Sequence, residues 1–215
     1  MATHISELII KALNPEIGDI TISKTGARNA PIGRGTDLKT IRFVLAQKPT
    51  LTTPFTPMAF DDGTRVSLDI RADNELEKSI KALDEKIRTY VIKNKAKFFK
   101  KPPTDEELIQ LYTPMLRIPD DNKYSNTVRT KMTLGDKPSA HFWHEDKTPF
   151  AEGQHKTIDW RNSQFAIQVR LKSVWFQANK SYGATLEVEH ILIKQADADC
   201  PFMVDEDCAF AEDES

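Results

Sequence analysis

The sequence has no cysteine before residue 200 and no basic residue after Lys194. Because its two cysteines, Cys200 and Cys208, both lie near the C-terminus, no disulfide can cross-link the first 195 residues. Two thiols without a nearby histidine do not form a structural zinc site, so we expect free, reduced thiols. The sequence also lacks an apolar run near the roughly 20 residues of a membrane span, and it lacks the features of a signal peptide. We therefore expect an intracellular protein without membrane contact.

The usual catalytic motifs are absent as well. The sequence contains no phosphate-binding loop, no dinucleotide-binding glycine pattern, no nucleophile elbow and no zinc-protease helix motif. The strongest metal candidate combines His141 and His144 with His155. Histidines three residues apart in a proline-flanked strand or loop lack the helical geometry that directs both rings at one ion, so we expect surface or packed histidines. Glu187 and Glu189 alternate along an expected strand, which is typical of a solvated face, and we predict no enzyme activity, no cofactor and no metal.

Charge is divided unevenly along the chain, although the net charge is only -2. Residues 196–215 contain eight of the 32 acidic residues and none of the 30 basic ones. Residues 1–195 therefore keep 30 basic and 24 acidic residues, a formal charge of +6 against -8 in the last twenty residues. We divide the chain into a folded nucleic-acid-binding domain, 1–195, and a flexible acidic tail, 196–215.

Alternation of apolar and polar residues predicts several strands. They are expected at about 20–23, 40–46, 65–70, 127–134, 164–178 and 184–194. The glycines and the proline of residues 26–35 predict an irregular loop. In the strand at 164–178, alternate side chains give a buried face and a basic outer face, and a phase change near His190 predicts a bulge in its partner.

Helical periodicity appears in the middle of the chain. A helix is expected at about 74–94, with Asn74 and Glu77 capping its start, and a short second helix is expected to begin at Thr104 and Glu107. This helical insertion, about 73–114, interrupts the strands. The order predicts a mainly β fold with a helical insertion, an OB-fold-like Greek-key barrel followed by a disordered acidic C-terminal tail. A β-sandwich with helical insertions is the alternative.

Basic residues recur next to aromatic residues in the C-terminal half. Single-stranded nucleic acid offers phosphates and unpaired base faces, so its binding proteins need cations along a groove with aromatic platforms between them. Duplex DNA hides its base faces, and the pattern therefore favours single strands. Trp175 and Phe176 are adjacent in a strand, so we expect one of them in the core. The candidate nucleic-acid-binding residues are Arg129, Lys131, Trp143, Lys147, Trp160, Arg170, Lys172, Trp175, Phe176, Lys180 and Tyr182.

The acidic tail can act on such a groove. A flexible polyanion tethered beside a cationic surface competes with nucleic acid at high effective concentration. Its aromatic and acidic residues can also dock into basic, apolar pockets of other proteins. The candidate tail residues for such contacts are Phe202, Asp205, Glu206, Asp207 and Phe210. A solubilising disordered end is the alternative.

The sequence resembles the single-stranded DNA-binding proteins of the bacteriophage T7 type and their relatives in large double-stranded DNA viruses. The resemblance rests on the body pattern, on residues 165–176 leading through Tyr182 and Gly183 into the last strand, and on the acidic, Phe-containing end. It implies an OB-fold core that binds single-stranded DNA without strong sequence preference in DNA replication, recombination and repair. It also implies a tail that modulates DNA access and contacts DNA polymerase or other replication proteins at sites of replication, in a host nucleus or a viral compartment.

Two other functions remain open on the sequence alone. The first is a protein-interaction or scaffold module, in which the aromatic residues are core and the acidic tail is the recognition element. The second is a metal-dependent enzyme using His141 and His144. A homodimer is also left open. In the phage protein the tail ends on an aromatic residue, whereas here five residues follow Phe210.

Overall fold

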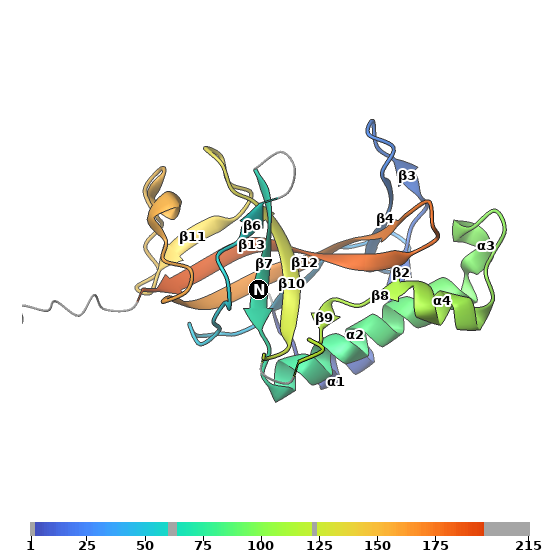
Figure 1. Cartoon of the computed structure of the whole chain (residues 1–215), viewed down its shortest axis with the longest axis horizontal. Helices are drawn as coiled ribbons and strands as arrows, with labels where there is room; N and C mark the ends of the chain where they lie inside the picture. Colours follow the sequence, from blue (N-terminus) through green and yellow to red (C-terminus); the bar gives the residue numbers. More distant parts are fainter. Residues whose placement is uncertain (1–2, 60–63, 122–123, 196–215) are drawn as a thin grey trace, which may run out of the picture.

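The computed structural model describes residues 3–59, 64–121 and 124–195, which form a mainly β body with a group of helices (Figure 1). The strands are β1 Thr3–His4, β2 Pro15–Ile17, β3 Thr21–Ile22, β4 Arg28–Arg34, β5 Ile41–Val44, β6 Met58–Ala59, β7 Arg65–Arg71, β8 Tyr112–Thr113, β9 Leu116–Arg117, β10 Thr127–Thr133, β11 His141–His144, β12 Gln164–Phe176 and β13 Tyr182–Lys194. The helices are α1 Glu7–Ala12, α2 Asn74–Lys93, α3 Lys95–Phe98, α4 Asp105–Leu111 and the 3-10 helix η1 Gln154–Thr157. The predicted fold class, mainly β with a helical insertion, is confirmed.

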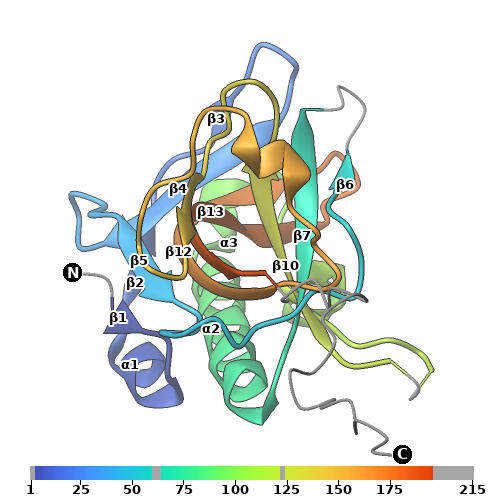
Figure 2. The same cartoon turned by 90° about the vertical axis from the view of Figure 1, so that its left-hand side faces the viewer.

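The long hairpin of β12 and β13 forms the middle of the sheet, whose main strand order is β1-β5-β12-β13-β10-β7-β6. Two register shifts interrupt its antiparallel pairing. One adds Glu189 to β13, which confirms the bulge predicted near His190, and the other adds Lys172 to β12. Bulges increase the local twist of a sheet, and Figure 2 shows the sheet curling toward a barrel.

Strand β4 corrects the prediction of an irregular loop at 26–35. Its first residues pair with β12, and from Ile32 onward it pairs with β2 instead, so the strand bends at Pro31, where it changes partner. Gly33 permits a close approach to the following loop, because a Cβ there would lie 2.3 Å from the Leu38 backbone. The glycine and proline that signal a loop here allow a bent strand.

The helical insertion follows the predicted pattern closely. Thr104 and Glu107 form the predicted capping box of α4. The predicted cap of α2 is wrong by one residue, because Asp73 occupies the cap position and its Oδ1 accepts a hydrogen bond from the Leu76 amide at 2.8 Å. The apolar stripe of α2 is buried, with Leu76, Ile80, Leu83, Ile87 and Val91 inside.

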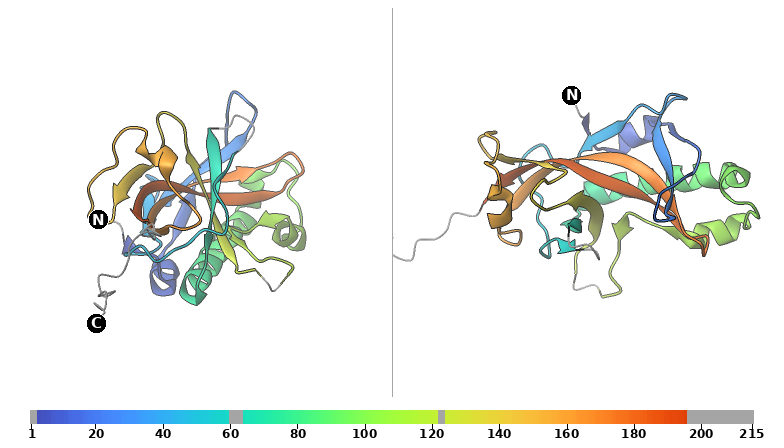
Figure 3. Two further views of the ribbon diagram at one scale, coloured as in Figure 1. Left: turned by 60° about the vertical axis from the view of Figure 1, so that its left-hand side comes forward. Right: turned by 90° about the horizontal axis from the view of Figure 1, so that it is seen from above.

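One hydrophobic core lies between the sheet and α2, which runs beneath the β12–β13 hairpin (Figure 3). Helix α1, which the sequence pattern does not predict, packs beside α2 and contributes Ile10 to this core. No helix in the described parts of the chain has both the length and the apolar character needed to cross a membrane. On the opposite face of the sheet, polar side chains alternate with the core residues of β7, β10 and β12.

Candidate functional site

The outer face of the sheet carries three adjoining depressions, which together form one groove. The central groove, of about 690 Å³, is lined among others by Arg28, Asn29, Arg65, Thr113, Pro114, Arg117, Arg129, Lys131, Trp175 and Thr185. The basic arm, of about 610 Å³, shares Asn29, Arg65, Lys131 and Thr185 with it and continues to Lys172 and Glu187. The apolar arm, of about 730 Å³, shares Thr113, Pro114 and Arg117 with it and continues to Phe55, Asp69, Arg71 and Tyr124.

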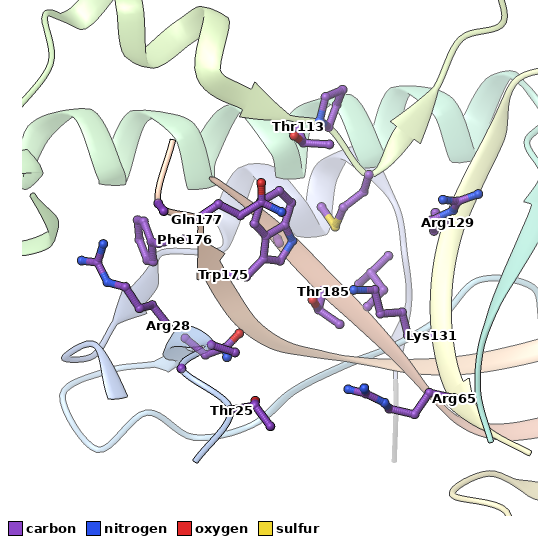
Figure 4. A pocket seen from close by; sticks show the side chains of 18 of the residues that line it. Thr25, Arg28, Arg65, Thr113, Arg129, Lys131, Trp175, Phe176, Gln177 and Thr185 are labelled. Carbon is purple, nitrogen blue, oxygen red and sulfur yellow. The ribbon is translucent and has the colours of Figure 1, made fainter. Parts of the chain in front are cut away.

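Trp175 lies in the middle of the central groove (Figure 4). It is paired across the hairpin with Gly183, and its indole lies directly over that glycine, because a Cβ at Gly183 would come within 2.7 Å of the ring. The glycine therefore allows the ring to lie against β13 with its other side toward the groove. A half-buried indole held in this way is suited to stacking against a planar group.

Cations surround this ring. Figure 4 shows Arg28 on one side of Trp175 and Lys131, Arg65 and Arg129 on the other. Burial lowers the pKa of Lys131, and the neighbouring charges of Arg129, Arg65 and Lys172 lower it further. Burial likewise lowers the pKa of Arg117, with Arg129 contributing. These like charges oppose one another, so an anion bound among them would be stabilised.

The described lining of the three depressions contains seven basic residues and two acidic ones. Both acids are already engaged. Arg129 donates two hydrogen bonds to the Asp69 carboxylate, at 2.8 and 2.7 Å. Glu187 accepts hydrogen bonds from Arg170, at 2.5 Å, and from Lys172. Among the described lining residues, basic side chains therefore outnumber acidic ones, and both acids are held in ion pairs.

One wall of the central groove is the segment 112–117, and a buried carboxylate holds it in place. Asp84 of α2 accepts a hydrogen bond of 2.5 Å from the Tyr112 hydroxyl and one of 3.2 Å from the Met115 amide. Burial raises the pKa of Asp84 to about 6, although these hydrogen bonds act in the opposite direction. Helix α2 thus supports this wall of the groove from the core side.

Five of the sequence-predicted residues lie on the outer face of the sheet with side chains that are not part of the core. Arg129, Lys131 and Trp175 line the central groove, and Lys172 lines the basic arm. Arg170 lies beside them on β12, in the ion pair with Glu187. The basic outer face predicted for residues 164–178 is therefore present, but part of its charge is neutralised by β13.

Three predicted aromatic residues belong to the core, although Phe176 also borders the central groove. Trp160 stacks on Phe165, and Phe176 stacks on Phe98 and Tyr182. Tyr182 is fully buried, and burial raises its pKa to about 12. The expectation that one of Trp175 and Phe176 is buried is confirmed, since Phe176 is only 3% exposed.

The remaining predicted residues do not line the groove. Trp143 pairs with Leu192, nine residues along β13 from Gly183, which corresponds to about 30 Å of strand. Its indole Nε1 donates to His190 Nδ1 at 3.2 Å. Lys147 follows β11 in a turn at the same end. Lys180 does not line the groove, but it lies in the β12–β13 turn beside it, where its amide donates to the carbonyl of the groove residue Gln177 at 3.0 Å. The predicted tail residues, Phe202 to Phe210, lie outside the described residues.

Several groove residues are not among those predicted from the sequence. Arg65 and Arg71 alternate with the buried residues of β7, and this outward phase is the signal that could have found them. Arg28 falls in the segment expected to be a loop. Phe55 and Tyr124 lie in irregular segments without periodicity, so no sequence pattern marks them.

The predicted metal candidates do not converge. His155 Nε2 lies 2.8 Å from the Gly135 carbonyl oxygen, and the ring of His141 stacks on His190. His144 lies against Phe150 and Gln154. Within the described ranges, no group of three or more histidine, cysteine or acidic side chains is arranged to hold a metal ion.

No protein-family model and no curated protein matches the sequence. Similar solved structures include the single-stranded DNA-binding protein of bacteriophage Enc34 in complex with single-stranded DNA, at 11% identity over 85% of this chain and 93% of that chain, with a TM-score of 0.42. They also include the single-stranded DNA-binding protein encoded by bacteriophage T7, at 14% identity over 77% of this chain and 97% of that chain, with a TM-score of 0.44. The T7-type protein that the sequence resembles is thus a structural neighbour. At this level of similarity, the function of the chain is inferred from its own residues.

Proposed function

We propose that this protein binds single-stranded DNA without strong sequence preference. The observation that carries the proposal is the groove itself, in which cations from β4, β7, β9 and β10 surround the indole of Trp175. Phosphates supply the negative charge that this groove accommodates, and unpaired bases supply the planar faces that stack on an indole. The sequence resemblance to T7-type proteins selects DNA as the partner.

The groove suits a single strand better than a duplex. In a duplex the base faces are stacked inside, so the phosphates alone would contact the cations and the indole would have no partner. Stacking contributes about 1 to 3 kcal/mol per base and accepts every base, which accounts for binding without sequence preference.

The division of charge supports a further role for the tail. We propose that residues 196–215, with their eight acids, compete with DNA for the groove and contact other replication proteins. Such a protein would act in DNA replication, recombination and repair, at the sites where single strands are exposed.

Fluorescence anisotropy tests the binding proposal. Labelled oligothymidylate, an RNA oligomer of the same length and a DNA duplex are each titrated with the full chain at several salt concentrations. We expect the tightest binding to oligothymidylate, with an affinity that falls as salt rises. Absence of binding to oligothymidylate at low salt would contradict the proposal and would favour a protein-interaction module, whereas tighter binding to the RNA would change the partner.

A further inference from the structure

The apolar arm differs in character from the rest of the groove. It is lined by Pro54, Phe55, Leu116, Ile118, Pro119 and Tyr124, in addition to its polar residues. Phe55 is 52% exposed, and Ile118 and Tyr124 are each 64% exposed. Half of the six large hydrophobic residues that are exposed in the described parts of the chain thus gather around one depression. Exposed apolar surface concentrated in this way indicates a binding site.

Cations flank this apolar surface. Thr127 of β10 is paired with Arg71 of β7 on one side and with Arg117 of β9 on the other, so the two arginines lie on either side of it. The one acid described in the lining, Asp69, is engaged with Arg129. The arm therefore suits a ligand that combines planar apolar groups with negative charge.

The apolar arm is also continuous with the central groove. Thr113, Pro114 and Arg117 line both depressions, and Arg117 therefore lies where one passes into the other. Thr127 in the apolar arm and Arg129 and Lys131 in the central groove alternate with the buried residues of β10, so a DNA strand that follows this face of β10 passes from one depression into the other. Trp175 and the two exposed rings of the arm, Phe55 and Tyr124, then contact successive parts of the same DNA strand.

We infer that the apolar arm is a second base-stacking subsite, in which Phe55 and Tyr124 hold unpaired bases at one end of the bound strand while Arg71 and Arg117 contact its phosphates. This inference rests on the proposed function and extends it, because it gives the site a length and a direction. Short oligomers occupy the central groove, and only longer ones reach the arm.

A length series tests the inference. Oligothymidylates of increasing length are titrated against the full-length protein and against the Phe55→Ala/Tyr124→Ala double variant. We expect the two proteins to bind the shortest binding oligomer with equal affinity. We expect the variant to bind long oligomers at least about fivefold more weakly than the unaltered protein. Ile109→Ala removes a comparably exposed apolar side chain from α4 and serves as the matched control, with no expected change at any length.

The outcomes separate this inference from the proposed function. If the unaltered protein binds no oligomer, the proposed function fails. If it binds but the double variant loses nothing at any length, or loses the same factor at every length, the second subsite is wrong. If the variant binds long oligomers more tightly than the unaltered protein, and deletion of residues 196–215 abolishes that difference, the tail occupies the arm and the inference is overturned.

A cross-linking experiment gives the direction of the strand. 5-Iododeoxyuridine is placed at the 5′ end or the 3′ end of a long oligothymidylate, and the irradiated complex is digested and mapped. We expect the peptide containing Tyr124 to be cross-linked from one end only. Equal cross-linking from both ends, or none from either, would contradict a subsite at one end of the strand.

Discussion

At the scale of single residues, the register of β12 decides which aromatic ring faces the groove. The alternation from Phe165 to Leu171, continued without interruption, would place Trp175 inside and Phe176 outside. The additional residue in β12, Lys172, reverses the phase, so Val174 and Phe176 are buried and Trp175 faces outward. The sequence predicts that one of the two rings is buried. It does not show which one, because a bulge of one residue leaves no signal in the sequence.

Substitution of the exposed ring tests this assignment. Trp175→Ala is expected to weaken binding of oligothymidylate by about 5- to 150-fold, since one stacking contact of about 1 to 3 kcal/mol is lost. Anisotropy measures the affinity, and thermal unfolding checks that the variant remains folded. Tyr182→Phe is the matched control: its ring is buried and its hydroxyl has no hydrogen-bond partner among the described residues, so affinity should not change. A large loss for Tyr182→Phe with none for Trp175→Ala would contradict the site.

At the scale of elements, the helical insertion is predicted better than the surface that it supports. Periodicity and capping chemistry are local, and they predict where α2 and α4 begin to within one residue. The position of the segment 112–117 depends instead on the buried Asp84, a contact across 28 residues to Tyr112. Strand β4 is missed for a related reason, because its pairing with β12 outweighs the local preference of glycine and proline. Both elements line the groove, so the site is less predictable than the helices.

The anchor at Asp84 predicts a pH dependence of stability. Its folded pKa of about 6 lies above the ordinary 3.8, so the folded state favours the protonated form. The resulting stabilisation is fully present below about pH 3.8 and is lost as the pH rises through about 6, a change of about 3 kcal/mol. Asp84→Asn does not titrate, and its free energy of unfolding should rise relative to the unaltered protein between pH 4 and pH 7. Urea unfolding at several pH values measures this difference, and parallel pH profiles for the two proteins would contradict it.

At the scale of the whole molecule, the charge division and the recurrence of basic next to aromatic residues predict a class of protein. The position of the candidate site can be predicted only once the fold is known. The body charge of +6 follows from composition alone. Predicted residues such as Trp143 and Lys147 lie outside the groove, while Arg65 and Arg71 are brought into it by β7, which is distant in sequence from β12. Long-range pairing of strands sets these positions, and one sequence does not reveal it.

The charge division predicts the effect of removing the tail. Deletion of residues 196–215 is expected to tighten binding of oligothymidylate, on the order of tenfold at low salt, because the tethered polyanion no longer competes for the groove. The effect should shrink as salt screens the charges. Anisotropy of the full and shortened chains at matched salt measures it. Unchanged or weaker binding by the shortened chain at low salt would contradict competition by the tail.

The salt dependence of binding by two charge-matched variants tests most directly whether the groove is the DNA site. Arg65→Gln/Lys131→Gln removes two cations from the central groove, whereas Lys78→Gln/Lys147→Gln removes two from outside it, one on α2 and one in the turn after β11. A plot of log affinity for oligothymidylate against log salt should lose about 1.4 from its slope in the first variant, at about 0.7 per phosphate contact, and should keep its slope in the second. Equal slopes in the two variants would show that the cations of the groove do not contact the DNA backbone.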